Sequence, residues 1–147
     1  MQVRRLTPAD TGLARELFVT IAGVFGEDSD KLGDDYLKRL LAREGFWAIA
    51  ALDGERVVGG LTAHTLPMTA TESSVVFLYD LAVRRSHQRR GIGRLLVQAL
   101  RDAAKAAGAL EVFVGADNGD EQALEFYRAL GGEATRATFY SFPLTRP

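Results

Sequence analysis

Apolar residues recur at spacings of three and four in four segments of the chain, and this periodicity predicts four amphipathic helices. The first follows Thr7-Pro8-Ala9-Asp10, where a hydroxyl, a proline and a carboxylate in this order are typical of a helix start. The second carries Tyr36, Leu37, Leu40 and Leu41 on one side, which we expect to pack on the core. The helices are expected from residue 8 to the glycine at 26, over 34–43, from 92 to the glycine at 108, and over 121–130.

Shorter apolar runs between these segments predict the strands of one sheet. The runs over 46–52 and 56–66 flank Asp53-Gly54, a dipeptide typical of a tight turn, and therefore predict an antiparallel hairpin. The longest run covers 73–83, and its almost unbroken apolar character predicts a central strand buried on both faces, with Asp80 as its single carboxylate. Further strands are expected over 2–6, 110–114 and 135–142.

The order of the elements sets the direction of two of these strands. A long helix separates the strands over 73–83 and 110–114, which indicates that they run parallel, joined by a right-handed crossover. The hairpin is antiparallel, so the central sheet is mixed and the predicted fold class is α/β. A length of 147 residues with 47% apolar residues suits one core, and we expect a single domain over residues 1–147.

Composition excludes several classes of function. The net charge of −1 offers no general attraction to nucleic acid or to an anionic membrane, so a charged partner has to be met by local charge. The absence of cysteine excludes disulfides and thiolate chemistry, and His64 and His87 lack the spacing of a metal pair, so we expect no metal. The first ten residues lack an apolar signal core, and no uncharged run is long enough to cross a bilayer, so we expect a cytoplasmic protein.

The segment most informative about function is Gln88-Arg89-Arg90-Gly91-Ile92-Gly93, between the 73–83 strand and the third helix. The first amides of a helix have no partner within the helix, and the helix dipole favours negative charge there. Glycines allow the backbone to approach an anion closely, and arginines add charge-assisted hydrogen bonds. The segment therefore predicts a phosphate-binding turn, although a solvated basic turn would carry the same residues.

Two common nucleotide motifs do not fit this turn. A P-loop requires Lys and then Ser or Thr after its last glycine, where this chain has Arg94 and Leu95. The dinucleotide fingerprint requires a third glycine where this chain has Leu96. The remaining pattern, Gln-X-X-Gly-X-Gly after a strand and before an amphipathic helix, resembles the pyrophosphate-binding motif of the GNAT acetyltransferases.

The resemblance extends over nearly the whole chain, because the predicted order of strands and helices is similar to the GNAT order. Within that superfamily, three segments resemble the aminoglycoside 3-N-acetyltransferases. They are Tyr79-Asp80-Leu81-Ala82-Val83, Ala116-Asp117-X-Gly119-Asp120 and Phe126-Tyr127-X-X-Leu130-Gly131.

The GNAT resemblance implies that acetyl-CoA binds where the two parallel strands splay apart, with its diphosphate on residues 88–93. It also implies that backbone groups of Leu81 and Val83 pair with the pantetheine arm, and that an amide near Leu81 to Val83, a stretch that includes Ala82, polarises the thioester carbonyl. Arg84 and Arg85 are further candidates to face the phosphates.

Two residues are candidates for proton transfer. An acid alone in an apolar strand is desolvated, which favours its neutral form and makes it a better base, so Asp80 is expected to take the proton of the attacking amine. A structural aspartate bonded to neighbouring amides is the alternative. By resemblance, Tyr127 is placed near the CoA sulfur as a general acid; its spacing from Leu124 and Leu130 also fits packing in the core.

The acceptor is expected to be a polycationic small amine, such as an aminoglycoside acetylated at its 3-amino group. Asp117, Asp120 and Glu121 form an acidic loop that would attract it, and by resemblance Tyr79 and Asp80 contact it. Ordinary surface charge, or charge at the start of a helix, would explain the three acids equally well. Another amine acceptor and an acyl-CoA-binding sensor stay open as alternatives, and by analogy with related enzymes we expect a homodimer.

Overall fold

The computed structural model describes residues 1–145. The chain divides into two compact units, one formed by Met1–Gly115 and one that begins at Ala116. The expectation of a single domain over residues 1–147 stays a prediction.

The first unit is built on a five-stranded sheet in the order β1-β2-β3-β4-β5. Pairing is antiparallel from β1 to β4 and parallel between β4 and β5, which confirms the mixed α/β sheet. The hairpin around Asp53-Gly54 is also confirmed as β2 and β3. The strands are β1 (Gln2–Arg5), β2 (Phe46–Asp53), β3 (Arg56–Pro67), β4 (Ser74–Val83) and β5 (Val112–Val114).

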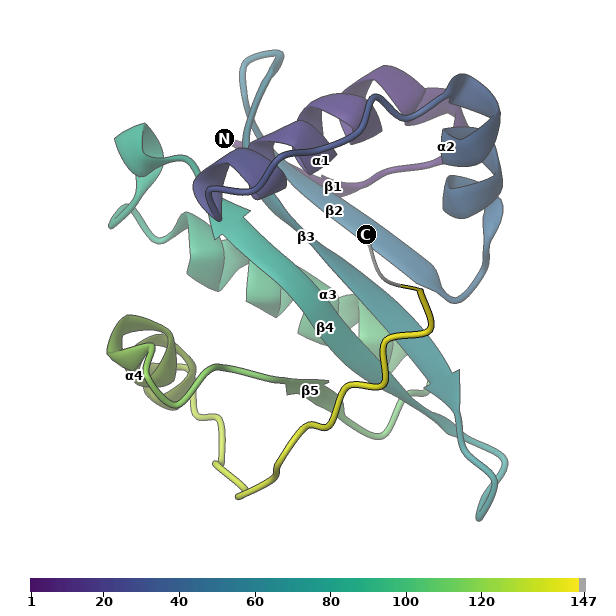
Figure 1. The fold of residues 1–147 in the computed structure, drawn as a ribbon, viewed down its shortest axis with the longest axis vertical. Helices are drawn as coiled ribbons and strands as arrows, with labels where there is room; N and C mark the ends of the chain where they lie inside the picture. The colour runs from purple at the N-terminus through teal and green to yellow at the C-terminus, as the bar shows by residue number, and fades with distance from the viewer. Residues whose placement is uncertain (146–147) are drawn as a thin grey trace. The chain divides into compact units, whose positions relative to one another are not determined.

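Helices cover both faces of this sheet. The helices α1 and α2 lie over one face, and α3 lies over the other, where it follows β4 in the chain (Figure 1). The core between α1, α2 and the sheet is made of fully buried side chains such as Leu17 and Leu37, and α3 buries Leu96 and Leu100 on the opposite face. The helices are α1 (Thr11–Val24), α2 (Asp34–Ala42) and α3 (Ile92–Ala106), with short 3-10 turns η1 (Pro8–Asp10) and η2 (Arg85–His87).

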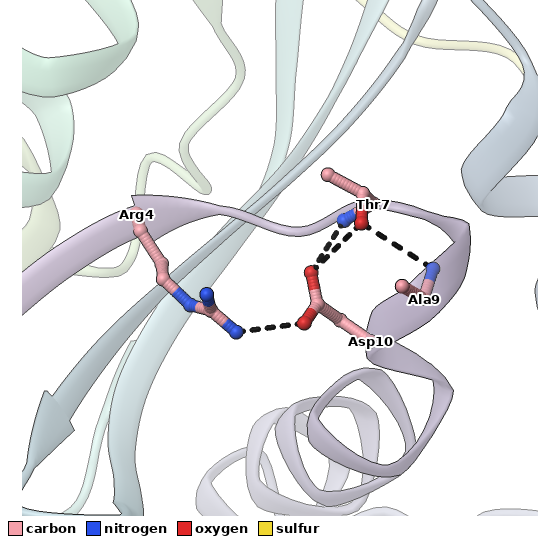
Figure 2. A network of polar contacts seen from close by, with 4 residues as sticks. All are labelled: Arg4, Thr7, Ala9 and Asp10. Atoms are coloured by element: carbon pink, nitrogen blue, oxygen red, sulfur yellow. Dashed lines mark hydrogen bonds and ion pairs between the residues drawn. The ribbon is translucent and has the colours of Figure 1, made fainter.

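The predicted start of the first helix is present as a complete capping box (Figure 2). The Thr7 hydroxyl accepts from the amide of Ala9 at 3.3 Å, and the Thr7 amide donates to Asp10 at 2.8 Å. Arg4 donates to the other oxygen of Asp10 at 2.7 Å. The Thr7 amide, with smaller contributions from the Thr7 hydroxyl and Arg4, holds the pKa of Asp10 below its usual value. This carboxylate therefore stabilises the fold above its unfolded-state pKa, and the contribution is lost as pH falls through the lowered value.

Helix α1 approaches the sheet closely because β3 has a glycine below it. A Cβ atom on Gly60 would lie 2.5 Å from the Ile49 carbonyl oxygen and would overlap the Leu17 side chain. A Cβ atom is essentially never found within 3 Å of backbone, so β3 would have to move away from the Ile49 carbonyl of β2, and the Leu17 side chain of α1 would have to move as well, to admit a methyl group.

We expect Gly60→Ala to lower the free energy of unfolding by about 2–3 kcal/mol, because the added methyl group overpacks this contact. Denaturant unfolding measures the change. Gly23→Ala is the matched control, since Gly23 lies in α1 and a Cβ atom there would meet nothing within 4 Å; alanine there should stabilise the helix by up to about 1 kcal/mol. Equal effects of the two substitutions would contradict the packing argument.

Two expectations about burial are wrong. Strand β4 is not buried on both faces, because Tyr79 is 63% exposed and Phe77 and Leu81, two residues to either side, are only half-buried. Helices α1 and α2 cover the face that carries Tyr79 without reaching this ring, so an apolar run alone does not establish double coverage. Tyr36 was expected on the packed side of α2 but is 50% exposed; Leu37 and Leu41 make that packing.

One strand prediction is right in part and one fails. The strand expected over 110–114 is present as β5 but begins two residues later, at Val112, because its ladder with β4 begins at the pair Val76 and Val112. Residues 135–142, expected as a last strand, form no strand at all. Phe139, Tyr140 and Phe142 are all exposed, so this segment has no buried face to select a strand register. The second unit has one regular element within the described residues, α4 (Glu121–Ala129), close to the helix predicted over 121–130.

Candidate functional site

A β-bulge in β4 shapes the centre of the candidate site. Thr62 of β3 pairs with Asp80, and the next residue of β3, Ala63, pairs with Leu78, which leaves Tyr79 as an extra residue. A bulge of this kind turns two successive side chains of one strand toward the same face. Contacts with β3 confirm it: the Asp80 carboxylate meets Thr62 and the Tyr79 ring meets His64, and Thr62 and His64 share a face because they are two residues apart.

The Asp80 carboxylate is half-buried and held by one neighbour. The Thr62 hydroxyl, itself buried, donates to Asp80 Oδ2 at 2.6 Å. The Thr62 hydroxyl is an internal partner that fixes one oxygen of the carboxylate, and an oxygen of Asp80 is left to accept a proton or a hydrogen bond from a ligand. Asp80 therefore has a hydrogen-bond partner, which is a side chain. A purely structural aspartate was expected to accept from neighbouring backbone amides instead.

The two parallel strands separate directly beside this carboxylate. Pairing between β4 and β5 covers Val76 to Leu78 and ends there, whereas β4 continues to Val83 in pairing with β3. Within residues 1–145 no strand pairs with the other edge of β4 from Asp80 to Val83. Backbone groups on an unpaired edge can accept an extended ligand as an added strand. This edge carries the predicted cofactor-binding residues Leu81, Ala82 and Val83.

The predicted phosphate turn follows β4 and is tied back to it. The Gln88 side chain donates to the Val83 carbonyl at 2.9 Å. Arg89 has a φ of 63°, rare for a residue other than glycine, and Gly91 has a φ of 80° as the N-cap of α3. Strained backbone of this kind persists where the surrounding structure holds it and is concentrated at functional sites.

The first amides of α3 are available to a ligand. No acceptor within residues 1–145 pairs with the amides of Gly91, Ile92 or Gly93. The Ile92 side chain is buried and anchors the helix, while Arg89 and Arg90 are exposed. The turn thus combines unpaired amides, a helix N-terminus and two exposed guanidinium groups, which suits a diphosphate.

The structure gives Arg84 a task inside the fold. Its guanidinium donates to the Val57 carbonyl at 2.9 Å and to the Thr20 hydroxyl at 3.0 Å, so it joins α1, β3 and the end of β4. Two N–H groups of Arg84 are therefore bonded inside the fold, which favours a structural role for this side chain, and its contact with the phosphates stays a prediction. Arg85, the next residue, is exposed.

The remaining predicted site residues belong to the second unit. Asp117 accepts from the Gly119 amide at 2.7 Å and shapes the turn before α4. Asp120 is the N-cap of α4 and accepts from the Ala123 amide at 3.0 Å, so its helix-capping role is established. Glu121 is exposed in the first turn of the same helix.

Tyr127 lies on α4 and is half-buried, with its ring against Phe126 at a centroid distance of 5.1 Å. Burial and, second, the negative charge of Asp120 raise the pKa of Tyr127. A raised phenol pKa means that the hydroxyl keeps its proton at neutral pH and above, which is the state a general acid requires.

Sequence reasoning missed the residues of β3 that contact Asp80 and Tyr79. Thr62 and His64 carry no motif, and only the bulged register brings them to this carboxylate and this ring. Alternation along β3 could have placed Thr62 and His64 on one face of the sheet. It could not have shown which residues of β4 lie opposite them.

The part of the chain that the structure describes contains no group of three or more His, Cys, Asp and Glu residues that could hold a metal ion. Among the helices of residues 1–145, none is long and apolar enough to cross a membrane.

One end of β4 thus combines a bulge with a carboxylate, an unpaired strand edge and an amide-lined turn before a helix, an arrangement that suits an extended ligand with a diphosphate. The family model of the Acetyltransferase (GNAT) family matches residues 13–131, and the chain belongs to this family. It is an acetyl-transferring enzyme of a family whose members use acetyl-CoA.

Solved structures of similar sequence are aminoglycoside acetyltransferases. One from an uncultured soil metagenomic sample is 33% identical, with a TM-score of 0.93 and 98% of each chain covered. A second from such a sample, in complex with sisomicin, is 32% identical with a TM-score of 0.90, covering 97% of this chain and 95% of that one. An aminoglycoside N-acetyltransferase in complex with CoA shares the fold at a TM-score of 0.81 and 18% identity, with 98% and 95% covered.

A curated relative carries a different activity in its name. Mycothiol acetyltransferase of Rhodococcus jostii is 37% identical over 92 residues, which are 60% of this chain. The match spans 29% of the length of that relative.

Proposed function

We propose that this enzyme transfers the acetyl group of acetyl-CoA directly to a primary amine of an aminoglycoside, at the 3-amino group of the deoxystreptamine ring, a reaction that confers resistance to the antibiotic. The observation that carries the proposal is the Asp80 carboxylate, which the bulge turns to the same face as Tyr79, beside the unpaired edge of β4. The similar proteins of known structure, one of them with bound sisomicin, support an aminoglycoside as acceptor.

In the proposed reaction, acetyl-CoA supplies the thioester carbonyl that the amine attacks. Its diphosphate would rest on residues 88–93, with Gln88, Arg89, Arg90, Gly91, Ile92 and Gly93 as the binding residues. Asp80 takes a proton from the acceptor ammonium, because only the neutral amine has a lone pair for attack. An amide of Leu81, Ala82 or Val83 would stabilise the negative charge that develops on the carbonyl oxygen.

The carbon–nitrogen bond forms as the carbon–sulfur bond breaks. The nitrogen loses its remaining extra proton to solvent, and the sulfur receives one from the Tyr127 phenol, which solvent then restores. Tyr79, Asp117, Asp120 and Glu121 are proposed to orient the polycationic acceptor by charge and contact. We also propose a homodimer in the cytoplasm.

Another small amine is the second candidate acceptor. The similarity to mycothiol acetyltransferase over 92 residues favours this second candidate. Proteins that share a fold can act on different acceptors, so the likeness to aminoglycoside acetyltransferases does not by itself fix the acceptor.

Thiol release from acetyl-CoA tests the proposal. The purified chain is incubated with gentamicin-like and kanamycin-like aminoglycosides, a polyamine and a peptide with a free N-terminus, and the acetylated position is assigned by NMR. We expect release with the aminoglycosides and a product acetylated at the 3-amino group. Release with only the peptide or polyamine would overturn the acceptor assignment, and acetylation at another amine would overturn the regiochemistry.

Tyr127→Phe is expected to lower the single-turnover rate of acetyl transfer about 100-fold, because the sulfur then leaves without a proton donor. Since burial and, second, the charge of Asp120 raise the pKa of Tyr127, the donor form persists across neutral pH, and no loss of activity in that range should trace to this residue. Tyr140→Phe is the matched control, as Tyr140 is an exposed tyrosine of the same unit. Unchanged transfer by Tyr127→Phe would leave the residue a role in packing only.

A further inference from the structure

Four rings form a continuous line across three strands beside Asp80. Phe113 of β5 stacks on Phe77 of β4, with centroids 4.8 Å apart and planes 9° from parallel. Phe77 meets Tyr79 edge to face at 5.8 Å, and Tyr79 meets His64 of β3 edge to face at 5.7 Å. These four residues, His64, Phe77, Tyr79 and Phe113, are called the aromatic strip.

The aromatic strip reaches the core at one end and is open to solvent at two of its other rings. At its inner end His64 contacts Phe46, which is buried in the core beneath α1. Tyr79 is 63% exposed and Phe113 is 36% exposed, although both lie in strands of the central sheet. Aromatic surface left open on a sheet face costs stability in water and is typical of a binding surface.

The charge on this face favours a positively charged ligand. Aromatic rings present a negative face to a cation that lies within about 6 Å of the centroid. The Asp80 carboxylate shares the face with His64 and Tyr79, since the bulge turns it there and Thr62 holds it. The Asp80 carboxylate suits one ammonium group of a ligand. The ring faces beside it suit a neighbouring ring of the same ligand that has an apolar C–H face and an ammonium group of its own.

We infer that the aromatic strip binds a non-reacting, ammonium-bearing ring of the acceptor while Asp80 engages the amine to be acetylated. The inference rests on the proposed function and deepens it, because it predicts selection for acceptors that have a second ring with its own ammonium group. The C–H face of that ring packs on Tyr79 and Phe77, and its ammonium gains cation–π attraction. Phe113 extends the surface by one strand.

The test compares two variants at position 79: Tyr79→Phe, which keeps an aromatic ring, and Tyr79→Leu, which removes it. With a kanamycin-like acceptor of several rings, the KM of Tyr79→Leu is expected to exceed that of Tyr79→Phe by about tenfold, since only phenylalanine keeps a π face. With a single-ring monoamine acceptor the two variants should differ less than about twofold, because that ligand does not reach the strip. Phe113→Leu should raise KM for the larger acceptor in the same direction.

Two readouts separate this inference from other causes. Tyr36→Leu removes an exposed tyrosine from α2, outside the strip, and should leave both acceptor KM values as in the wild type. The KM for acetyl-CoA and the Tm of the position 79 variants identify any damage to the cofactor site or the fold.

The possible outcomes are distinct. If the wild type acetylates no aminoglycoside, the proposed function fails, and the same comparison is made with whichever polyamine and monoamine it does acetylate. If Tyr79→Leu and Tyr79→Phe have equal KM values for the multi-ring acceptor, or if the monoamine shows the same ratio, the inference about the aromatic strip is overturned.

Discussion

Asp80→Asn is expected to lower kcat about 100- to 10,000-fold, the range that removal of a general base produces. Asparagine keeps the size of the side chain, and its amide oxygen can still accept from the Thr62 hydroxyl, so the bulge should be retained. What is lost is the site that takes the proton of the acceptor ammonium. Affinity for CoA, measured by calorimetry, should stay within about twofold because Asp80 lies outside the phosphate turn.

The matched control for this substitution is Glu72→Gln. Glu72 is an exposed carboxylate just before β4, at the opposite end of the strand from Asp80, and its change removes the same charge. It should leave kcat unaltered. Near-normal turnover of Asp80→Asn would show that water or another group takes the proton and that Asp80 serves only the fold.

Gly91→Val is expected to weaken CoA binding at least about 100-fold, equivalent to two lost charge-assisted hydrogen bonds. Gly91 has a φ of 80°, and a Cβ atom there would meet nothing within 4 Å, so the expected cost of valine is backbone strain. A β-branched residue avoids this left-handed conformation, and the turn has to change its backbone angles. The amides of Ile92 and Gly93 then no longer point as a group toward one ligand.

The control lies at the other end of the same helix. Gly108 follows α3 with a φ of 86° and is equally uncrowded, so Gly108→Val introduces the same strain away from the turn. Both variants should lose about 1–2 kcal/mol of stability. Only Gly91→Val should lose affinity for CoA; a similar loss in both, or in neither, would contradict the assignment of the diphosphate to this turn.

Local signals were enough to predict most elements of the first unit. Thr7 and Asp10 specified the helix start, because a capping box depends on side chains three residues apart. Asp53-Gly54 specified the hairpin for the same reason, since a tight turn is set by its own residues. The start of α3 at a glycine turn was also readable, as Gly91 and the residues around it act within a few positions of one another.

The bulge at Tyr79 could not be predicted, and with it the immediate surroundings of Asp80. Whether Thr62 opposes Asp80 or the neighbouring residue depends on how β3 and β4 pair over their full length. A shift of one residue exchanges the two faces of a strand, and an apolar run reads the same in either register. For this reason the contact of Tyr79 with His64, and the aromatic strip as a whole, came only from the structure.

The segment over 135–142 shows that strand propensity alone does not predict a strand. Its β-branched and aromatic residues favour an extended chain, yet a strand also requires the edge of another strand to pair with. In the structure these residues form no strand. Propensity is a property of the segment, whereas pairing is a property of two segments.

The amino-acid sequence by itself determined the order of elements from β1 to α4, the mixed sheet and the amide-lined turn at the head of α3, because periodicity, capping and glycine placement act over a few residues. Tertiary structure alone decided which side chains meet: Asp80 with Thr62, Tyr79 with His64, and Arg84 with Thr20. Those contacts join residues that are distant in the chain, and they depend on strand register and helix packing, which no local pattern encodes.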